Sequence, residues 1–256
     1  MVDQVLIKKA TDSGIRKMNL LQKDPGRYMV RSILAGMYLT IVLSVFWMLA
    51  NNLHESPFGK VVACLFFGVG LSAIVFTNTE LFTSNNMYLS VSTMEGGTGW
   101  GDTAMLWTAC YFGNLIGAIV IAGLLYGAGI LTALPPDHAL FVGAAHKVHQ
   151  SASVIFFKGI LANWVVCLAV RLALHCKEDI AKIAIMMLVV SMFLYLGAEH
   201  SIANMGTFSM ALMGSGTITV WDAMYNLLYS TIGNIIGGAV VFAIPFRYIN
   251  PTHEAE

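Results

Sequence analysis

The stretch AEHSIANMG, residues 198–206, decides the fold, because it places a glutamate, a histidine and an asparagine inside a hydrophobic segment. A second stretch, TELFTSNNM at residues 79–87, interrupts an earlier hydrophobic segment, and aligning Glu80 with Glu199 also aligns Asn85 with Asn204. Polar side chains within a bilayer are costly to insert, so they usually line a cavity or a substrate path. Paired interruptions in two halves of a membrane chain indicate a binding site near the bilayer midplane, and therefore a transport protein.

The composition is that of a membrane protein. Hydrophobic residues make up 57% of the chain, charged residues only 11%, and the mean hydropathy is +0.72, whereas soluble domains carry about 25% charged residues. The formal net charge of zero argues against binding of nucleic acid, which needs a basic domain. The four cysteines show no CxxC spacing, so we expect small buried hydrophobes and not disulfides or metal ligands. The first thirty residues lack an apolar run, so we expect no cleavable signal peptide.

Six hydrophobic stretches are long enough to cross a bilayer, which takes roughly 20 residues per helix. We expect these spans at residues 33–53, 61–79, 104–134, 154–174, 180–198 and 225–244. Short apolar runs at 87–91 and 208–213 follow the two polar breaks and are expected to be the second halves of broken helices. The pattern predicts an all-α integral membrane protein with six transmembrane helices, of which the second and fifth are broken.

Lysine and arginine residues predict the orientation and the division of the chain. Seven of them precede the first span, and only Lys60, Lys147 and Lys158 fall on the side opposite the termini. The positive-inside rule therefore places both termini in the cytoplasm, with the protein in the inner membrane.

We expect an amphipathic segment at residues 1–31, lying on the membrane surface and able to cover the pore. A channel domain at 32–247 and a cytoplasmic tail at 248–256 complete the chain.

Three landmarks recur in the same order in the two halves of the chain. ILAG at residues 33–36 corresponds to ILAN at 160–163, the first polar break to the second, and GNLIGA at 113–118 to GNIIGG at 233–238. Each half holds three spans, an odd number, so the second copy must insert upside down. Such a 3+3 inverted repeat places two broken helices face to face near the midplane, where their N-termini favour an anion. The glycines of the third landmark also permit close helix packing.

With these motifs the sequence resembles the formate/nitrite transporter family. The resemblance rests on ELFT at 80–83, EHSIANM at 199–205 and IGNIIGG at 232–238, supported by LANWVVCLA at 161–169 and HKVH at 146–149, and extends from about residue 24 to residue 246. It implies an aquaporin-like helical fold, a homopentamer with one pore per protomer, and passage of small monovalent anions such as formate, nitrite and hydrosulfide. The segment at residues 214–221 is short, as in the nitrite and hydrosulfide branches.

The resemblance also implies a pore with two apolar constrictions around a central chamber. Leu71, Leu81 and Phe82 would form the cytoplasmic constriction, and Phe67 and Phe193 the periplasmic one. From composition alone these five side chains would be ordinary core residues, and only the resemblance assigns them to the pore.

Between the constrictions, the resemblance implies a chamber with His200 and Thr83, with Asn163 and Asn234 nearby and with Lys147 polarising the region around His200. A histidine in a helix break is expected to be functional, because its unperturbed pKa of about 6.5 lets it carry a proton near neutral pH. Thr83 could donate to a passing anion or cap the second half-helix. Lys147 could be a solvated loop lysine or could attract anions to the pore.

Glu80 and Glu199 repeat symmetrically, which leaves two roles open. They could accept hydrogen bonds from the backbone N–H groups that the helix breaks set free, or they could contact the substrate.

These features predict a channel or transporter for small monovalent weak-acid anions (nitrite, hydrosulfide or formate), and not an enzyme. An anion in a dry constriction loses its hydration at a cost of several kcal/mol. Protonation by His200 would let it cross as a neutral acid; otherwise the pore must hydrate. The expected partners are these anions, protons, the lipid bilayer and further copies of the chain, with no nucleic acid, no cofactor and no metal.

Other functions leave different signatures. A neutral-solute pore of the aquaporin type predicts paired Asn-Pro-Ala motifs, and the sequence has none. An intramembrane metalloenzyme would need a ligand set such as HExxH, and the sequence has Glu199-His200 without a second spaced histidine. In such a metalloenzyme the candidate ligands and catalytic groups would be Glu80, Glu199, His146, His149 and His200. A purely structural membrane protein would not need two polar helix breaks.

Overall fold

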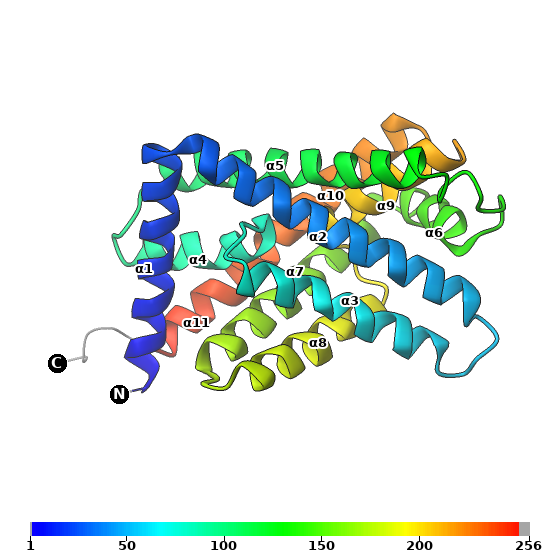
Figure 1. Ribbon diagram of the computed structural model, residues 1–256. Helices are drawn as coiled ribbons and strands as arrows, with labels where there is room; N and C mark the ends of the chain where they lie inside the picture. The colour runs from blue at the N-terminus through cyan, green and yellow to red at the C-terminus, as the bar shows by residue number, and fades with distance from the viewer. Residues whose placement is uncertain (1, 251–256) are drawn as a thin grey trace.

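The computed structural model describes the backbone of residues 2–250 and the side chains from residue 5 on, and this part of the chain is helical without a strand. The long helices run side by side, and α1 lies across one end of them (Figure 1). In chain order the elements are α1 (Val2–Lys23), α2 (Pro25–Asn52), α3 (Gly59–Phe76), α4 (Phe82–Met94), α5 (Trp100–Gly127), α6 (Ala139–Val148), α7 (Ala152–His175), α8 (Asp179–Tyr195), α9 (Ser201–Gly214), α10 (Val220–Ile235), the π-helix η1 (Ile236–Ala243) and α11 (Ile244–Tyr248).

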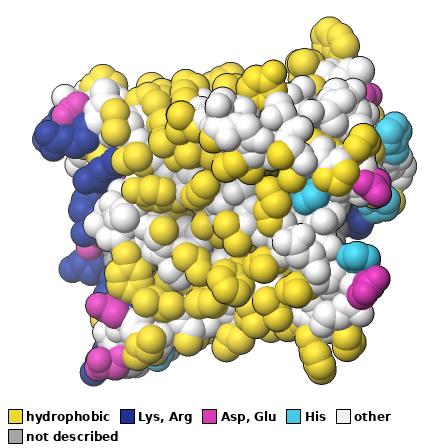
Figure 2. All heavy atoms as spheres, turned by 45° about the vertical axis from the view of Figure 1, so that its right-hand side comes forward, with side chains coloured by type: hydrophobic (Ala, Val, Ile, Leu, Met, Phe, Trp, Pro, Cys, Tyr) yellow, Lys and Arg dark blue, Asp and Glu magenta, His cyan; other side chains and the backbone are white. Residues whose placement is uncertain are grey.

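Five helical stretches in the described residues are long and apolar enough to cross a membrane: α2, α3, α5, α7 and the stretch Val220–Tyr248. This confirms the predicted all-α membrane class. Figure 2 shows Lys and Arg side chains gathered at one end of the molecule, histidines near the other, and hydrophobic side chains over the surface between them. Several large apolar side chains, such as Phe112, Leu124 and Leu228, are more than half exposed, as expected for residues that face lipid or another subunit.

Two predicted boundaries differ from the structure for local reasons. The first span begins at Pro25 and not near residue 33, because Asp24 caps α2 by accepting a hydrogen bond from Arg27 N (3.0 Å) and proline suits the first helical position. The third span ends at Gly127 and not at residue 134, since the chain turns at Gly129 with a φ of +76°. Glycine adopts that left-handed conformation without strain.

Non-helical residues separate α3 from α4 and α8 from α9, and each gap holds one of the two glutamates. The chain turns at equivalent places, Asn78 (φ +53°) and Gly197 (φ +66°). The N–H of Glu80 then donates to the carbonyl of Arg31, and the N–H of Glu199 donates to the carbonyl of Lys158, both at 3.2 Å. Each gap is therefore fixed to the first long helix of its own half.

The glycines of the GN landmark bring helix backbones into contact. A Cβ at Gly117 would collide with the Ile33 carbonyl oxygen on α2, and a Cβ at Gly237 would collide with the Ile160 carbonyl oxygen on α7. This confirms the close packing predicted for these glycines, and it occurs at equivalent positions of the two halves.

Helix α1 has an apolar face, as expected, but protein covers it. Leu6, Ile7, Ala10 and Met18 are buried, α1 packs along α4, and Gly14 lies so close to Ser92 that a Cβ would collide with it. The face is therefore not open to a lipid surface. Of the tail expected at 248–256, residues 251–256 lie outside the described part of the chain.

Candidate functional site

The buried carboxylate of Glu199 forms one end of the candidate site. Lys147 Nζ (3.0 Å) and Asn204 Nδ2 (2.6 Å) donate to its Oε2, Gln150 Nε2 donates to its Oε1 (3.0 Å), and Asn226 Nδ2 lies 3.5 Å from Oε2. Only 1% of the Glu199 side chain is exposed. A buried charge needs such partners, because an unpaired one costs several kcal/mol. Lys147 is thus not a solvated loop lysine: it lies in the last turn of α6 and forms an ion pair with Glu199.

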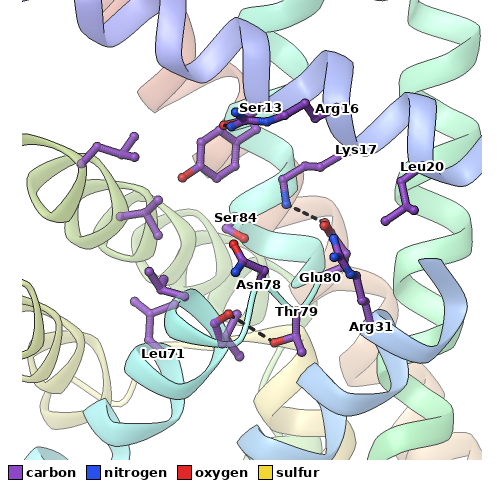
Figure 3. A pocket seen from close by; sticks show the side chains of 15 residues that line it. Ser13, Arg16, Lys17, Leu20, Arg31, Leu71, Asn78, Thr79, Glu80 and Ser84 are labelled. Carbon is purple, nitrogen blue, oxygen red and sulfur yellow. Dashed lines mark hydrogen bonds and ion pairs between the residues drawn. The ribbon is translucent and has the colours of Figure 1, made fainter. Parts of the chain in front are cut away.

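Glu80 forms the other end of the site in a similar way. Lys17 Nζ donates to Glu80 Oε2 at 2.6 Å (Figure 3). Asn85 Nδ2 donates to the same oxygen at 3.1 Å. Lys17 was expected only among the cations that set the orientation, and not at this site. The repeated landmarks did not indicate it, because Lys17 comes from α1, which precedes the first landmark at residue 33.

Two asparagines hold the backbone at the two gaps. Asn114 accepts from the N–H of Phe82 (3.0 Å) and donates to the carbonyls of Ser32 (2.7 Å) and Glu80 (2.9 Å). Its counterpart Asn234 accepts from the N–H of Ser201 (2.8 Å) and donates to the carbonyls of Gly159 (2.8 Å) and Glu199 (2.9 Å).

Asn114 and Asn234 thereby satisfy the backbone groups that the gaps leave open. Asparagines, and not the glutamates, therefore accept hydrogen bonds from the freed backbone N–H groups of Phe82 and Ser201. The two Gly-Asn pairs of the repeat indicated both positions in the sequence, but they did not predict that the asparagines bind the backbone at the gaps.

His200 and Thr83 meet, as the resemblance implied. Thr83 Oγ1 lies 2.9 Å from His200 Nε2, although the two residues come from the starts of α4 and α9. His200 Nδ1 accepts a hydrogen bond from Ala203 N (3.1 Å) and so caps α9. Since a backbone N–H can only donate, Nδ1 is unprotonated, and the neutral ring carries its hydrogen on Nε2, where it can donate to Thr83. Thr83 is bonded to His200 and does not cap α4, whose N-cap residue is Leu81.

Aromatic side chains pack against His200 and at the residue before Thr83. The ring of Phe193 stacks on His200, with centroids 5.5 Å apart and planes at 22°, and Phe67 packs edge-on against Phe193 at 5.9 Å. Phe82 packs edge-on against Tyr111 at 5.1 Å. Such pairs keep the rings in fixed orientations.

Two cavities approach the site from different sides. One of about 600 Å³ is lined by Lys17, Glu80 and Leu71, and one of about 430 Å³ by Lys147, Glu199, His200 and Phe193, each with further side chains. Among the described residues none lines both cavities. The arrangement can therefore admit a small polar solute to either glutamate site, but it separates the two sites by packed side chains.

Asn163 serves the helix packing. One Nδ2 hydrogen goes to Asn86 Oδ1 (2.9 Å) and the other to the carbonyl of Asn234 (2.6 Å). That carbonyl lies just before η1, and a side chain inserted into a helix ladder is a known cause of local rewinding. Both donors of Asn163 are thus engaged with protein acceptors.

His138, outside the spans, caps α6, the helix whose last turn carries Lys147. Its Nδ1 accepts from Leu140 N at 3.2 Å and caps the helix. Burial lowers the pKa of His138 below its usual value, although the nearby Asp137 opposes this effect.

The family model described as formate/nitrite transporter matches residues 4–248 of the chain. The chain is 35% identical over 250 residues to the uncharacterized transporter YwcJ of Bacillus subtilis, covering 96% of this chain and 97% of that protein. It is 32% identical over 251 residues to the nitrite transporter NirC of Salmonella typhimurium, covering 97% and 92%.

Two solved structures have the same fold. An FNT family ion channel superimposes with a TM-score of 0.91 at 30% sequence identity, covering 96% of this chain and 99% of that one. A pentameric formate channel with formate bound gives a TM-score of 0.78 at 26% identity, covering 89% and 98%. The relatives and solved structures named here are transporters or channels.

Proposed function

The chain belongs to the formate/nitrite transporter family, and on that premise we propose that it conducts small monovalent weak-acid anions through a pore that passes the Thr83–His200 hydrogen bond. The observation that carries the proposal is this bond of 2.9 Å, because it joins the starts of two helices from the two halves of the chain. Each half also brings a Lys–Glu ion pair to a cavity, Lys17–Glu80 in one and Lys147–Glu199 in the other.

The proposed pore has six crossings arranged as a 3+3 inverted repeat with broken second and fifth helices. The contacts of Asn114 and Asn234 and the turns at Asn78 and Gly197 occur at equivalent positions and support this arrangement. The fifth crossing would consist of α8, with 17 residues, continued by α9. The proposed division is a cytoplasmic segment at 1–31, a channel domain at 32–247 and a cytoplasmic tail at 248–256, in the inner membrane with both termini inside.

The proposed assembly is a homopentamer with one pore in each subunit. The solved formate channel of the same fold is pentameric, and large apolar side chains remain exposed on this chain. In a pentamer some of these faces would pack against neighbouring subunits, and the others would face lipid.

The apolar side chains of the site would form two constrictions. Leu71, which lines the larger cavity, would close the pore on the cytoplasmic side together with Leu81 and Phe82. Phe193, which lines the smaller cavity and packs against Phe67, would close it on the periplasmic side. Four of these side chains are 1–2% exposed and Leu71 is 3% exposed, so the pore must open or hydrate for conduction.

His200 would contact the anion as a hydrogen-bond donor. A passing anion can replace Thr83 as the acceptor of the Nε2 hydrogen, or it can accept from the Thr83 hydroxyl group. Transfer of the Nε2 proton would release a neutral acid and leave an imidazolate, unless a second proton first reaches Nδ1. Because Nδ1 accepts from Ala203 N, proton-coupled transport requires that this cap opens, whereas passive conduction does not.

The experiment is a flux measurement with the purified protein in proteoliposomes, comparing formate, nitrite and hydrosulfide with a neutral solute such as glycerol. The proposal predicts flux of at least one of the three anions above that of protein-free liposomes. Glycerol flux without anion flux would overturn the proposal and favour a neutral-solute pore. Nitrite is the first anion to test, because the nitrite transporter NirC is 32% identical to this chain over almost its whole length.

A further inference from the structure

The side chains around the two glutamates differ, although the backbone around them is the same. The carbonyl of Arg31 accepts from the N–H of Glu80, and the carbonyl of Lys158 accepts from the N–H of Glu199. Arg31 and Lys158 therefore hold equivalent places, each a cationic residue beside a buried carboxylate. The two places differ in whether a side chain links the cation to the carboxylate.

In the second half of the chain, a carboxamide links the cation to the carboxylate. Gln150 Nε2 donates to Glu199 Oε1 at 3.0 Å, and Gln150 Oε1 accepts from Lys158 Nζ at 2.6 Å. The planar carboxamide of Gln150 thus bridges Glu199 and Lys158, because its nitrogen donates to one and its oxygen accepts from the other.

In the first half, no side chain in the described residues makes this bridge. Gln150 directly precedes the cap residue of α7; the residue directly before the cap residue of α2 is Lys23, which is exposed. Within the described part, the Arg31 guanidinium and Glu80 Oε1 form no hydrogen bond or ion pair, while Glu80 Oε2 binds Lys17. Arg31 and Glu80 both line the cavity of about 600 Å³ (Figure 3).

We propose that this cavity binds a small planar weak acid between Arg31 and Glu80, in the place that corresponds to the carboxamide of Gln150. The proposal rests on the proposed function, because it makes the conducted species the ligand. The ligand must accept from the guanidinium and donate to Glu80 Oε1 through two atoms of one planar group. Protonated formate and protonated nitrite have this pattern, whereas hydrosulfide has one heavy atom and cannot bridge the two side chains.

Binding of the anion takes up a proton. The anion meets the guanidinium of Arg31 with one oxygen, and a proton from solvent enters the hydrogen bond between its other oxygen and Glu80 Oε1. Only an O–H bond forms, and no redox partner is needed. Without that proton an anionic ligand would face the Glu80 carboxylate, and two like charges in contact disfavour the ionised form of both groups. The titratable or charged side chains around Glu80 are Arg16 and Lys17 on α1, Tyr28 and Arg31 on α2, Tyr88 on α4 and Cys110 on α5.

The charge balance in the cavity suits an anion. Lys17 is already paired with Glu80, so Arg16 and Arg31 are the additional cations on the cavity wall. Arg16 donates to the hydroxyl group of Ser13 on its own helix (2.9 Å), whereas Arg31 is joined to Glu80 through its carbonyl, which accepts from the N–H of Glu80.

The test is calorimetric titration of formate, nitrite and hydrosulfide into the purified full-length protein at pH 5.5 and pH 7, in two buffers of different ionisation enthalpy. The wild type is expected to bind formate and nitrite with uptake of a proton, so that the affinity rises by up to about tenfold per pH unit as the pH falls. Arg31→Gln should weaken binding by about tenfold or more, because a charge-assisted hydrogen bond is lost.

The matched control is Arg27→Gln, which removes the same charge from the same helix at an exposed position. Control binding should equal that of the wild type. Binding without proton uptake, binding unaffected by Arg31→Gln, or hydrosulfide binding as tight as formate binding would overturn the site. If anion flux is present while proton-linked binding is absent, the site fails and the channel function stands. If no anion is conducted, the channel function itself fails.

Discussion

Lys17 Nζ lies 2.6 Å from Glu80 Oε2, which joins α1 to the gap between α3 and α4. The corresponding pair, Lys147 and Glu199, joins α6 to the gap between α8 and α9 at 3.0 Å. In both halves a helix that precedes the first long helix supplies the cation, so each buried carboxylate depends on an element outside the bundle of long helices.

Lys17→Met is expected to lower the thermal stability of the protein. Glu80, whose side chain is 4% exposed, would lose its cation, and a buried carboxylate without a partner is unfavourable. The double variant Lys17→Met/Glu80→Gln should regain part of the loss, because the unpaired charge is gone. Thermal unfolding followed by tryptophan fluorescence measures the stability of both variants. If the single variant is as stable as the exposed control Arg27→Met, the ion pair does not hold α1 in place.

Asn234→Ala is expected to destabilise the protein by about 3 kcal/mol or more, because three hydrogen bonds to buried backbone groups are lost at about 1 kcal/mol or more each. Asn114→Ala should behave alike. Asn51→Ala removes a single bond, to Ala139 N, and serves as the control with a smaller effect. Denaturant unfolding compares them; an equal effect of Asn51→Ala and Asn234→Ala would contradict the role of the asparagines.

His138 is expected to make the stability depend on pH. Because its pKa is lowered in the folded protein, the unfolded chain binds a proton first as the pH falls below about 6.5. The stability is therefore full above that pH and declines below it, as the folded-state pKa is approached. His138→Asn keeps an acceptor at the cap and should reduce this decline. Melting temperatures between pH 5 and pH 8 test it; identical pH profiles of variant and wild type would refute the assignment.

Phe193→Ala is expected to raise anion flux and to reduce discrimination by size. The ring stacks on His200 and lines the smaller cavity, so its removal widens the proposed periplasmic constriction. Flux of formate and of the larger acetate in proteoliposomes measures the change. The control is Phe112→Ala, at a ring that is 54% exposed on the outer surface. Unchanged acetate flux in Phe193→Ala would show that this ring does not limit the pore.

Much of the fold could be predicted because hydrophobic length and the repeated polar stretches are local signals. The helical membrane class and the family follow from residues 79–87 and 198–206, and the GN landmarks mark the close helix contacts. The meeting of Thr83 with His200 came from the resemblance, since no spacing rule joins residues so far apart in the chain.

Other parts depend on tertiary contacts that leave no periodic signal. Lys17 was hidden because α1 precedes the first sequence landmark of the repeat, and Lys147 resembled a loop residue because α6 is short. The bridge from Gln150 to Lys158 required a glutamine, a lysine and a buried glutamate to converge, which spacing in the sequence does not show.

If anions pass His200, the pH profile of anion flux should depend on this histidine. Formate, nitrite and hydrosulfide flux would be measured between pH 5 and pH 8 for the wild type and for His200→Asn, which keeps a donor but cannot titrate. The account predicts a pH-dependent wild-type flux of at least one anion and a variant that conducts with a flatter pH profile. Identical pH profiles together with identical flux of the two proteins would contradict a role for His200 in conduction.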